Sequence, residues 1–124
     1  MQNETIGILH PGNMGIFVAA MLVDNGYPVH WVAKGRSDKS KMRAGKYNLI
    51  IHESLEEFCE NCSIIISVCP PHAAEAVADS VMKCNFDGTF VDANAISPMR
   101  TIKISEKMTS AEISFIDGGI VGGP

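Results

Sequence analysis

The sequence predicts an α/β fold in which a doubly wound parallel sheet of about six strands carries helices on both faces. Short apolar runs rich in β-branched residues alternate with amphipathic stretches at helical spacing, and the connections are short. A glycine-containing turn, "HPGNMG", follows the first apolar run and opens the first amphipathic stretch. A glycine turn in this place is typical of the strand order 3-2-1-4-5-6.

Composition and charge exclude several classes of protein. The 124 residues suffice for one core, and 46% hydrophobic with 19% charged residues excludes a disordered chain or a coiled coil. A net charge of −4 without a basic segment argues against a nucleic-acid or anionic-membrane partner. The start, "MQNETIGILH", lacks the pattern of an export signal, and no apolar run approaches the roughly 20 residues of a membrane span. We therefore expect a cytoplasmic protein.

The first half of the chain contains three predicted strands and one long helix. The strands lie within 5–10, 27–33 and 49–52, and a polar loop with a short helix covers 35–45. The helix covers 13–25 and is ended by glycine. Its apolar residues follow the spacing of a face that packs on a sheet: Met14, Phe17, Val18, Met21 and Leu22.

The second half continues the alternation. Ser54 and Glu57 form a capping box that begins a helix, and 63–68 is the most apolar strand and therefore a central one. A proline pair ends it. A helix follows, with one apolar face: Ala74, Val77, Ala78, Val81 and Met82. After a strand at 89–93, a serine cap and Pro98 begin a helix that runs to about Ser110. The last predicted strand covers 114–117.

The glycine turn is suited to a dinucleotide pyrophosphate, because a helix N-terminus offers free backbone N–H groups and the positive end of its dipole. His10 stands where the first glycine of a dinucleotide turn is expected, and Pro11 has no N–H. The donors are then the amides of the first helical turn: Gly12, Asn13, Met14 and Gly15. The His10 imidazole either points at the ligand or packs beneath the turn, and we favour packing.

The end of the second strand indicates which dinucleotide binds. An NAD site needs an acid there to accept the ribose 2′-hydroxyl, but the strand runs into Lys34, Gly35, Arg36 and Ser37 before Asp38. Arg36 can pair with a 2′-phosphate and stack on adenine, while Lys34 and Ser37 add donors. The alternative is a solvated basic loop. The pattern favours NADP.

Cys59 and Cys62 form a C-x-x-C, which has a functional and a structural interpretation. The functional one is a redox pair or half of a zinc site, yet neither Cys69 nor Cys84 completes a zinc spacing. The structural one is packing, since a free cysteine behaves as a small hydrophobe. We favour packing and predict no metal site.

The motifs together resemble the β-hydroxyacid dehydrogenases, a family that includes 6-phosphogluconate and 3-hydroxyisobutyrate dehydrogenases, with imine reductases as relatives. The matching segments are "GNMG", "GRS", "SVCPP", "VDANAISP" and "DGGIVGGP". The resemblance covers the whole chain as an N-terminal Rossmann-type NADP-binding domain at 1–117. The segment 118–124 then begins the substrate site and links to a helical domain that is absent from this chain.

The resemblance also implies site residues. The loop of Val68, Cys69, Pro70 and Pro71 would pass under the riboses, and Asn94 would lie near the nicotinamide. Gly122 and Gly123 match the family's paired substrate-binding glycines. Val121 departs from the family's serine, which argues against a 6-phosphogluconate-type substrate.

The implied activity is hydride transfer to or from a β-hydroxyacid-like or imine-like substrate. In the family, the helical domain supplies a catalytic lysine and the homodimer interface. We assign no catalytic residue within the 124 residues and expect this fragment alone to be inactive. The alternative from another class is a non-catalytic dinucleotide-binding or redox-sensing module, and a lesser one is an unrelated α/β ligand binder.

Overall fold

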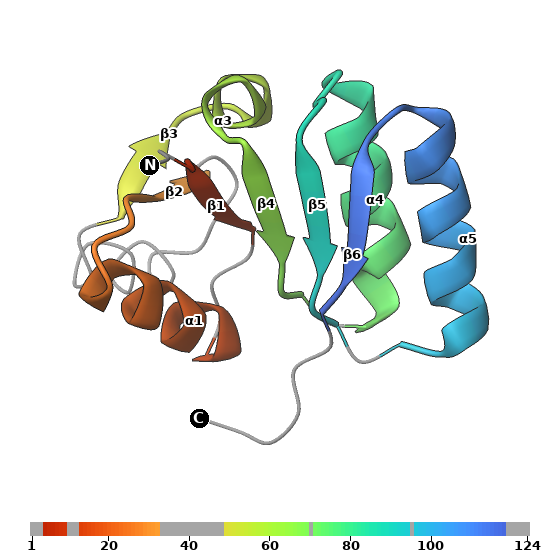
Figure 1. Cartoon of the computed structure of the whole chain (residues 1–124), viewed down its shortest axis with the longest axis horizontal. Helices are drawn as coiled ribbons and strands as arrows, with labels where there is room; N and C mark the ends of the chain where they lie inside the picture. Colours follow the sequence, from red (N-terminus) through yellow and green to blue (C-terminus); the bar gives the residue numbers. More distant parts are fainter. Residues whose placement is uncertain (1–3, 10–12, 33–48, 70, 95, 119–124) are drawn as a thin grey trace.

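The computed structural model describes residues 4–9, 13–32, 49–69, 71–94 and 96–118. These residues form a six-stranded sheet in the order β3-β2-β1-β4-β5-β6 (Figure 1). Its strands are β1 (Ile6–Leu9), β2 (Val29–Val32), β3 (Ile50–His52), β4 (Ile64–Ser67), β5 (Thr89–Asp92) and β6 (Ser114–Asp117). Every neighbouring pair is parallel. The predicted doubly wound α/β fold is confirmed.

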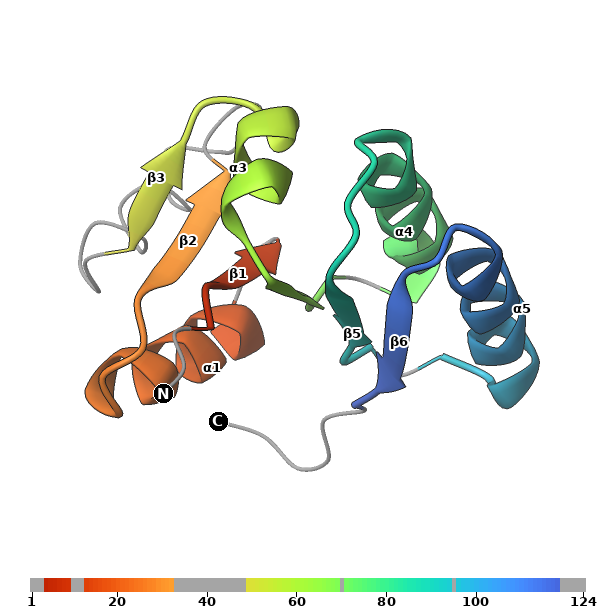
Figure 2. The same ribbon diagram turned by 45° about the horizontal axis from the view of Figure 1, so that its top comes forward.

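Helices cover both faces of the sheet. They are α1 (Asn13–Asp24), α3 (Leu55–Asn61), α4 (Ala74–Lys83) and α5 (Pro98–Ser110), with a 3₁₀ turn η1 (Pro71–Ala73) before α4. The core divides accordingly, because one cluster of buried side chains joins α1 to the sheet and the other joins α3, α4 and α5 to it. Figure 2 shows α4 and α5 side by side.

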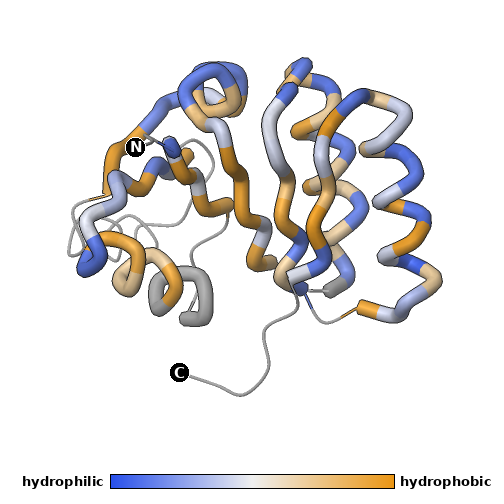
Figure 3. The backbone as a smooth tube through the Cα atoms, in the orientation of Figure 1, coloured by the Kyte–Doolittle hydropathy of each residue, from blue (hydrophilic) through white to orange (hydrophobic). Residues whose placement is uncertain are grey.

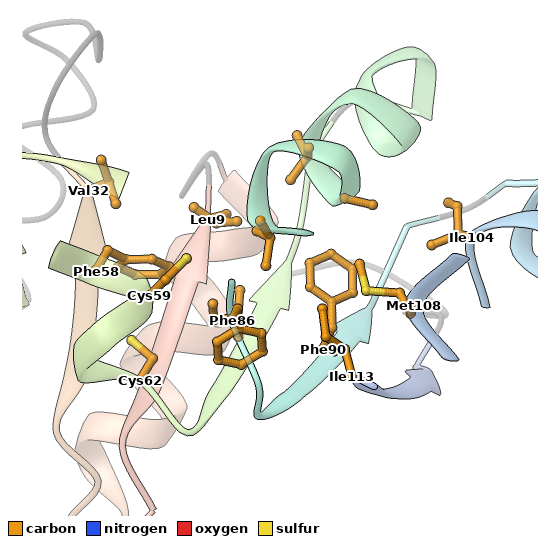
Figure 4. Close-up of a cluster of buried hydrophobic side chains, with 14 of the residues drawn as sticks. Leu9, Val32, Phe58, Cys59, Cys62, Phe86, Phe90, Ile104, Met108 and Ile113 are labelled. Atoms are coloured by element: carbon orange, nitrogen blue, oxygen red, sulfur yellow. The ribbon is translucent and has the colours of Figure 1, made fainter. Parts of the chain in front are cut away.

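The larger cluster is built on aromatic side chains. Phe58 of α3 and Phe90 of β5 are fully buried, and Phe86 is 4% exposed. Figure 4 shows these rings with Met108 of α5 between the helices and the sheet. Burying each such side chain stabilises the fold by about 1.5–3 kcal/mol. The helix face predicted from spacing in α4 is the one that packs here, with Ala74, Val77, Ala78 and Val81 buried. α5 contributes its buried residues Ile104 and Met108.

The smaller cluster corrects the predicted face of α1. Met21, expected to face the sheet, is 52% exposed, whereas Ala19 is fully buried against Ile8 and Trp31. Val18, Leu22 and Val23 of α1 pack around the same cluster. Among the predicted side chains that the structure describes, Val18 and Leu22 therefore pack against the sheet as expected, and Met21 does not.

Side-chain caps define two helix starts, as predicted. The hydroxyl of Ser54 accepts a hydrogen bond from the Glu57 amide at 3.1 Å, and that of Ser97 accepts one from the Arg100 amide at 3.3 Å. The capping box at α3 differs in one detail, because the Glu57 carboxylate accepts from the Glu53 amide instead of the Ser54 amide. Both arrangements satisfy amide groups that a helix start leaves free.

The hydropathy of each element follows its position in the fold. Figure 3 shows β4 as an apolar segment, whereas the tube alternates between polar and apolar along α5. β4 lies between β1 and β5, which confirms its predicted central place. The strand β6 forms an edge, and three of its four residues are exposed. Central strands of a parallel sheet are covered on both faces and therefore need apolar side chains throughout.

Candidate functional site

The carboxyl ends of the strands form the candidate site, because ligands of doubly wound sheets bind there. The order of strands reverses at β1, which pairs with β2 on one side and β4 on the other. β1 ends at Leu9 and α1 begins at Asn13, so the predicted helix start follows the first strand as expected. The N-terminus of α1 therefore lies at the edge where an anion would be bound.

Several predicted site residues lie outside the described residues. They are His10, Pro11 and Gly12 of the turn, Lys34 to Ser37 after the second strand, Pro70, and the glycines Gly122 and Gly123. Asn13 and Met14 are placed in the first turn of α1, and Pro71 in η1. Val68, Cys69 and Asn94 are described with their side chains, all at the carboxyl edge.

Asn94 connects the ends of β4 and β5. Its Oδ1 accepts a hydrogen bond from the backbone N–H of Cys69 at 2.7 Å, and its Nδ2 donates to the Ser67 hydroxyl at 3.2 Å. The Asn94 side chain is almost entirely buried, with 7% of the residue exposed. The Cys69 thiol lies 3.7 Å from the same serine oxygen. The structure thus brings together two predicted residues, Cys69 and Asn94, which hydrogen bond directly and also share a contact with Ser67, a residue that no motif indicated.

Asp92, at the end of β5, is hydrogen bonded to this network. It is 2% exposed, and its Oδ1 accepts a hydrogen bond from the Asn94 amide at 2.8 Å. Its Oδ2 is buried and has no hydrogen-bond partner among the described residues. Burial is the main cause that raises the pKa of the Asp92 carboxyl, and the negative charges of Asp117 and Glu75 raise it further. A carboxyl in these surroundings takes up a proton more readily than one in water.

An ion pair holds the starts of α4 and α5 together near the same edge. Arg100 donates from Nε and Nη2 to the two carboxylate oxygens of Glu75, at 2.7 and 2.5 Å. These hydrogen bonds lower the pKa of Glu75 to about 2. The two residues are 25 positions apart, so no local pattern indicated the pair.

The sequence did contain one signal for the hydrogen bonds around Asn94. Two apolar strands each end in a polar residue, Ser67 in β4 and Asp92 in β5, and this pattern could have located those contacts.

A second buried polar group joins β2 to β3. The Nδ1 of His30 lies 2.7 Å from the Nε2 of His52, and the rings stack with centroids 4.9 Å apart. The Nδ1 of His52 lies 3.3 Å from the Glu57 carboxylate of α3. Burial lowers the pKa of His30, as does a charge on His52. One of the two nitrogens in the close His30–His52 contact must be unprotonated to accept, so this hydrogen bond is lost when both rings are fully protonated.

We predict that this histidine pair makes stability fall in mild acid. The pKa of His30 is lower in the folded chain than its usual 6.5. Its contribution is therefore complete above pH 6.5 and is lost as the pH falls below it, by at most about 1.4 kcal/mol per pH unit. Urea unfolding of the wild type and of His30→Phe from pH 8 to 5 measures the difference. A variant with the same pH slope as the wild type would contradict the assignment.

The cysteines serve packing, as predicted. Cys59 and Cys62 both lie in the larger core cluster, 5% and 8% exposed. Burial is the main cause that raises the pKa of each thiol to about 12. A thiol that stays protonated at neutral pH is a poor nucleophile and a poor metal ligand. Within the described part of the chain, no group of three or more His, Cys, Asp or Glu residues could hold a metal ion.

No helix among the described residues is both long enough and apolar enough to span a membrane.

The chain matches a known protein family over nearly its whole length. A family model described as the NAD binding domain of 6-phosphogluconate dehydrogenase matches residues 5–124. Among the curated relatives is the mitochondrial 3-hydroxyisobutyrate dehydrogenase of Drosophila melanogaster, which is 27% identical over 128 residues. That match covers 97% of this chain but 37% of the fly enzyme.

Solved structures share the fold. The 3-hydroxyisobutyrate dehydrogenase of Mycobacterium tuberculosis with L-serine superposes with a TM-score of 0.88 at 21% identity, covering 98% of this chain and 42% of that one. An imine reductase from Myxococcus stipitatus in complex with NADP+ gives a TM-score of 0.84 at 17% identity, over 97% of this chain and 42% of that one. A variant of this reductase is in complex with NAD+. The chain thus spans about two-fifths of these proteins.

Proposed function

The chain belongs to the family of the NAD-binding domain of 6-phosphogluconate dehydrogenase, and from this premise we propose that it holds NADP(H) for hydride transfer to or from a β-hydroxyacid-like or imine-like substrate. The observation that carries the proposal is where α1 begins. This helix follows β1, the strand at which the order reverses, and it begins at the carboxyl edge of the sheet, where dinucleotides bind in folds of this kind.

The pyrophosphate is proposed to bind at the start of α1. The backbone amides of Gly12, Asn13 and Met14 donate to it, and His10 and Pro11 complete the turn. Three free amides at the positive end of a helix dipole compensate a doubly charged group without any basic side chain. The acidic balance of the chain, with a net charge of −4, is compatible with this kind of site.

The choice of NADP rests on the residues after β2. The segment that follows β2 contains Lys34, Gly35, Arg36 and Ser37 and has no acid before Asp38. A guanidinium pairs well with a 2′-phosphate, whereas an acid is what a ribose 2′-hydroxyl requires. The imine reductase structures contain NADP+ in one case and NAD+ in a variant, so the fold accepts either dinucleotide.

The nicotinamide end is proposed to lie over β4 and β5. Val68, Cys69, Pro70 and Pro71 form the loop beneath the riboses, and Asn94 lies at the end of β5. All five follow strands whose carboxyl ends meet at one edge of the sheet. The segment 118–124 follows the domain proposed at 1–117, and its residues Gly122 and Gly123 would bind the substrate. In the whole protein, a helical domain would complete the site and form a homodimer.

A calorimetric titration of the chain with NADPH, NADP+, NADH and NAD+ tests the proposal. We expect one site per chain, with the phosphorylated dinucleotides bound more tightly than their counterparts. Binding of all four with equal affinity would retain the dinucleotide site and contradict the NADP preference. If none of the four bound, the proposed function would be wrong.

Arg36→Ala is predicted to weaken NADPH selectively. Loss of a hydrogen bond to a charged group costs about 1.5–3 kcal/mol, or about 10- to 100-fold in affinity. NADH lacks the 2′-phosphate, so its affinity should hardly change. Lys103→Ala, which removes a positive charge from the exposed face of α5, is the control and should leave both affinities unchanged. An equal loss for both dinucleotides would mean that Arg36 stacks on adenine or holds the loop.

The 124 residues alone are predicted to bind the cofactor without turnover. Hydride transfer from a hydroxyl carbon needs a general base within about 3 Å of the proton that leaves. At the described carboxyl edge, the Asp92 carboxyl is 2% exposed and cannot reach a substrate. Reduction of NADP+ by this chain is measured with a panel of β-hydroxyacids, using the full-length fly 3-hydroxyisobutyrate dehydrogenase as positive control with its own cofactor. Turnover by the 124 residues would contradict the prediction.

A further inference from the structure

The hydrogen bonds between the ends of β4 and β5 involve the loop that follows β4. We infer that Ser67, Asp92 and Asn94 form a strand clamp, a set of positioning residues that holds the loop after β4 in the one arrangement the dinucleotide site requires. This inference rests on the proposed function for its ligand, but the clamp itself is defined by contacts within the chain.

The strand clamp begins where the sheet's own hydrogen bonds end. The last ladder contact between the two strands is the Ala93 amide donating to the Ser67 carbonyl at 3.1 Å. Beyond it one chain continues toward η1 and the other toward α5, and the Val68 amide faces β1, where it donates to the Leu9 carbonyl at 3.4 Å. The following amide, on the side of β5, belongs to Cys69, and the Asn94 Oδ1 accepts from it at 2.7 Å. A side chain thus continues the ladder by one step.

The Cys69 amide determines the orientation of the Asn94 side chain. Oδ1 accepts from this amide, while Nδ2 donates to the Ser67 hydroxyl, and a flipped side chain would place two N–H donors against each other at Cys69. Asn94 is 7% exposed, and both of its polar atoms already have protein partners. These contacts are those of a residue that acts through the loop it holds. The cofactor then contacts the loop after β4, which contains Cys69 and which the strand clamp holds in place.

Asp92 orients Asn94 through the backbone. Its Oδ1 accepts from the Asn94 amide at 2.8 Å, which turns the Asn94 side chain back toward β4. The charged and titratable groups around it are Asp117 on β6, Glu75 on α4, Arg100 on α5 and the Cys69 thiol after β4. Its Oδ2 is buried without a described partner, so a neutral group suits this place better than an anion. The acceptor Oδ1 is the part of Asp92 that the clamp uses.

The place of the strand clamp in the sheet connects it to the ligand. Ser67 pairs in register with Leu9, the last residue of β1, and with Asp92 on the other side. The clamp is therefore one strand away from the point where the strand order reverses. A loop displaced there loses its contacts with a bound dinucleotide even when the fold is intact, because binding groups must be held within fractions of an ångström.

The experiment compares Ser67→Ala, Asn94→Ala and their double variant with the wild type. Each single change should lower the affinity for NADPH by about 10-fold. The affinity of the double variant should be only slightly lower than that of the weaker-binding single variant, because the residues act as a unit. Ser63→Ala is the matched control. It removes a serine hydroxyl that accepts from the Thr5 amide at 2.9 Å, at the amino edge beside β4. It should lower the melting temperature and leave the affinity unchanged.

A conservative variant separates positioning from folding. Asp92→Asn keeps an oxygen acceptor in a neutral group and should bind NADPH within about 3-fold of the wild type. Asp92→Ala removes the acceptor and should resemble Asn94→Ala. Wild-type affinity in Ser67→Ala and Asn94→Ala, or an equal loss in Ser63→Ala, would overturn the inference.

A second readout does not depend on the cofactor. Hydrogen exchange of the Cys69 amide in the free chain should be faster in Ser67→Ala and Asn94→Ala than in the wild type, and unchanged in Ser63→Ala. Unchanged exchange in the clamp variants would overturn the clamp itself. A wild type that bound no dinucleotide but showed this exchange pattern would instead contradict the proposed function and the clamp's assigned ligand.

Discussion

Gly12→Val is expected to abolish dinucleotide binding while the domain stays folded. In the proposed site the pyrophosphate lies against the backbone at the start of α1, where the second glycine of a dinucleotide turn leaves room for close approach. A β-branched side chain would occupy the space between backbone and phosphate. Because several charge-assisted hydrogen bonds are lost together, the affinity should fall by more than about 100-fold.

Titration with NADPH and a thermal melt of the same sample measure this effect. Met21→Val is the control, because it places the same side chain on α1 at a residue that is 52% exposed. It should bind like the wild type. Gly12→Ala, with a smaller side chain, should fall between the two. If Gly12→Val retained wild-type affinity, the pyrophosphate would have to bind elsewhere on the domain.

Gly7→Val is expected to destabilise the fold by about 3 kcal/mol or more, lowering the melting temperature by on the order of 10 °C. Gly7 lies in β1 directly under α3. A Cβ added there would lie 2.6 Å from both the Cys62 Sγ and the Phe58 Cε1. Phe58 is fully buried among the side chains of the larger core cluster (Figure 4). The strand and the helix would have to separate.

Urea unfolding of Gly7→Val measures the loss, and a second substitution tests its cause. Phe58→Ala alone should destabilise by about 3–5 kcal/mol through the cavity it leaves. Combined with Gly7→Val, it provides room for the new side chain, so the double variant should be more stable than the sum of the single effects predicts. Strictly additive effects would show that the clash with Phe58 is not what destabilises the variant.

The elements of the fold were predictable because their signals are local. The alternation of β-branched runs with helical spacing, the serine caps at Ser54 and Ser97, and the glycine after α1 each act within a few residues. Parallel sheets built from such units have few allowed topologies, so the strand order could also be predicted. The exception was Met21, because spacing alone does not tell which of two adjoining faces packs more closely.

The candidate site could be predicted in its residues but not in its connections. Cys69 and Asn94 were identified from motifs, yet nothing in the sequence indicated that they hydrogen bond to each other. The pair His30 and His52 was not anticipated at all.

These contacts join residues on neighbouring strands that lie 22 to 27 positions apart in the sequence. Whether they meet depends on strand register. In β4 and β5 the register places Ser67 opposite Asp92, and in β2 and β3 it places Val32, two residues after His30, opposite His52. Local periodicity determined which segments are strands and helices, because backbone preferences and amphipathic spacing operate over one or two turns. Register is decided only when the helices pack, since the fit of the two cores selects how far each strand slides past its neighbour.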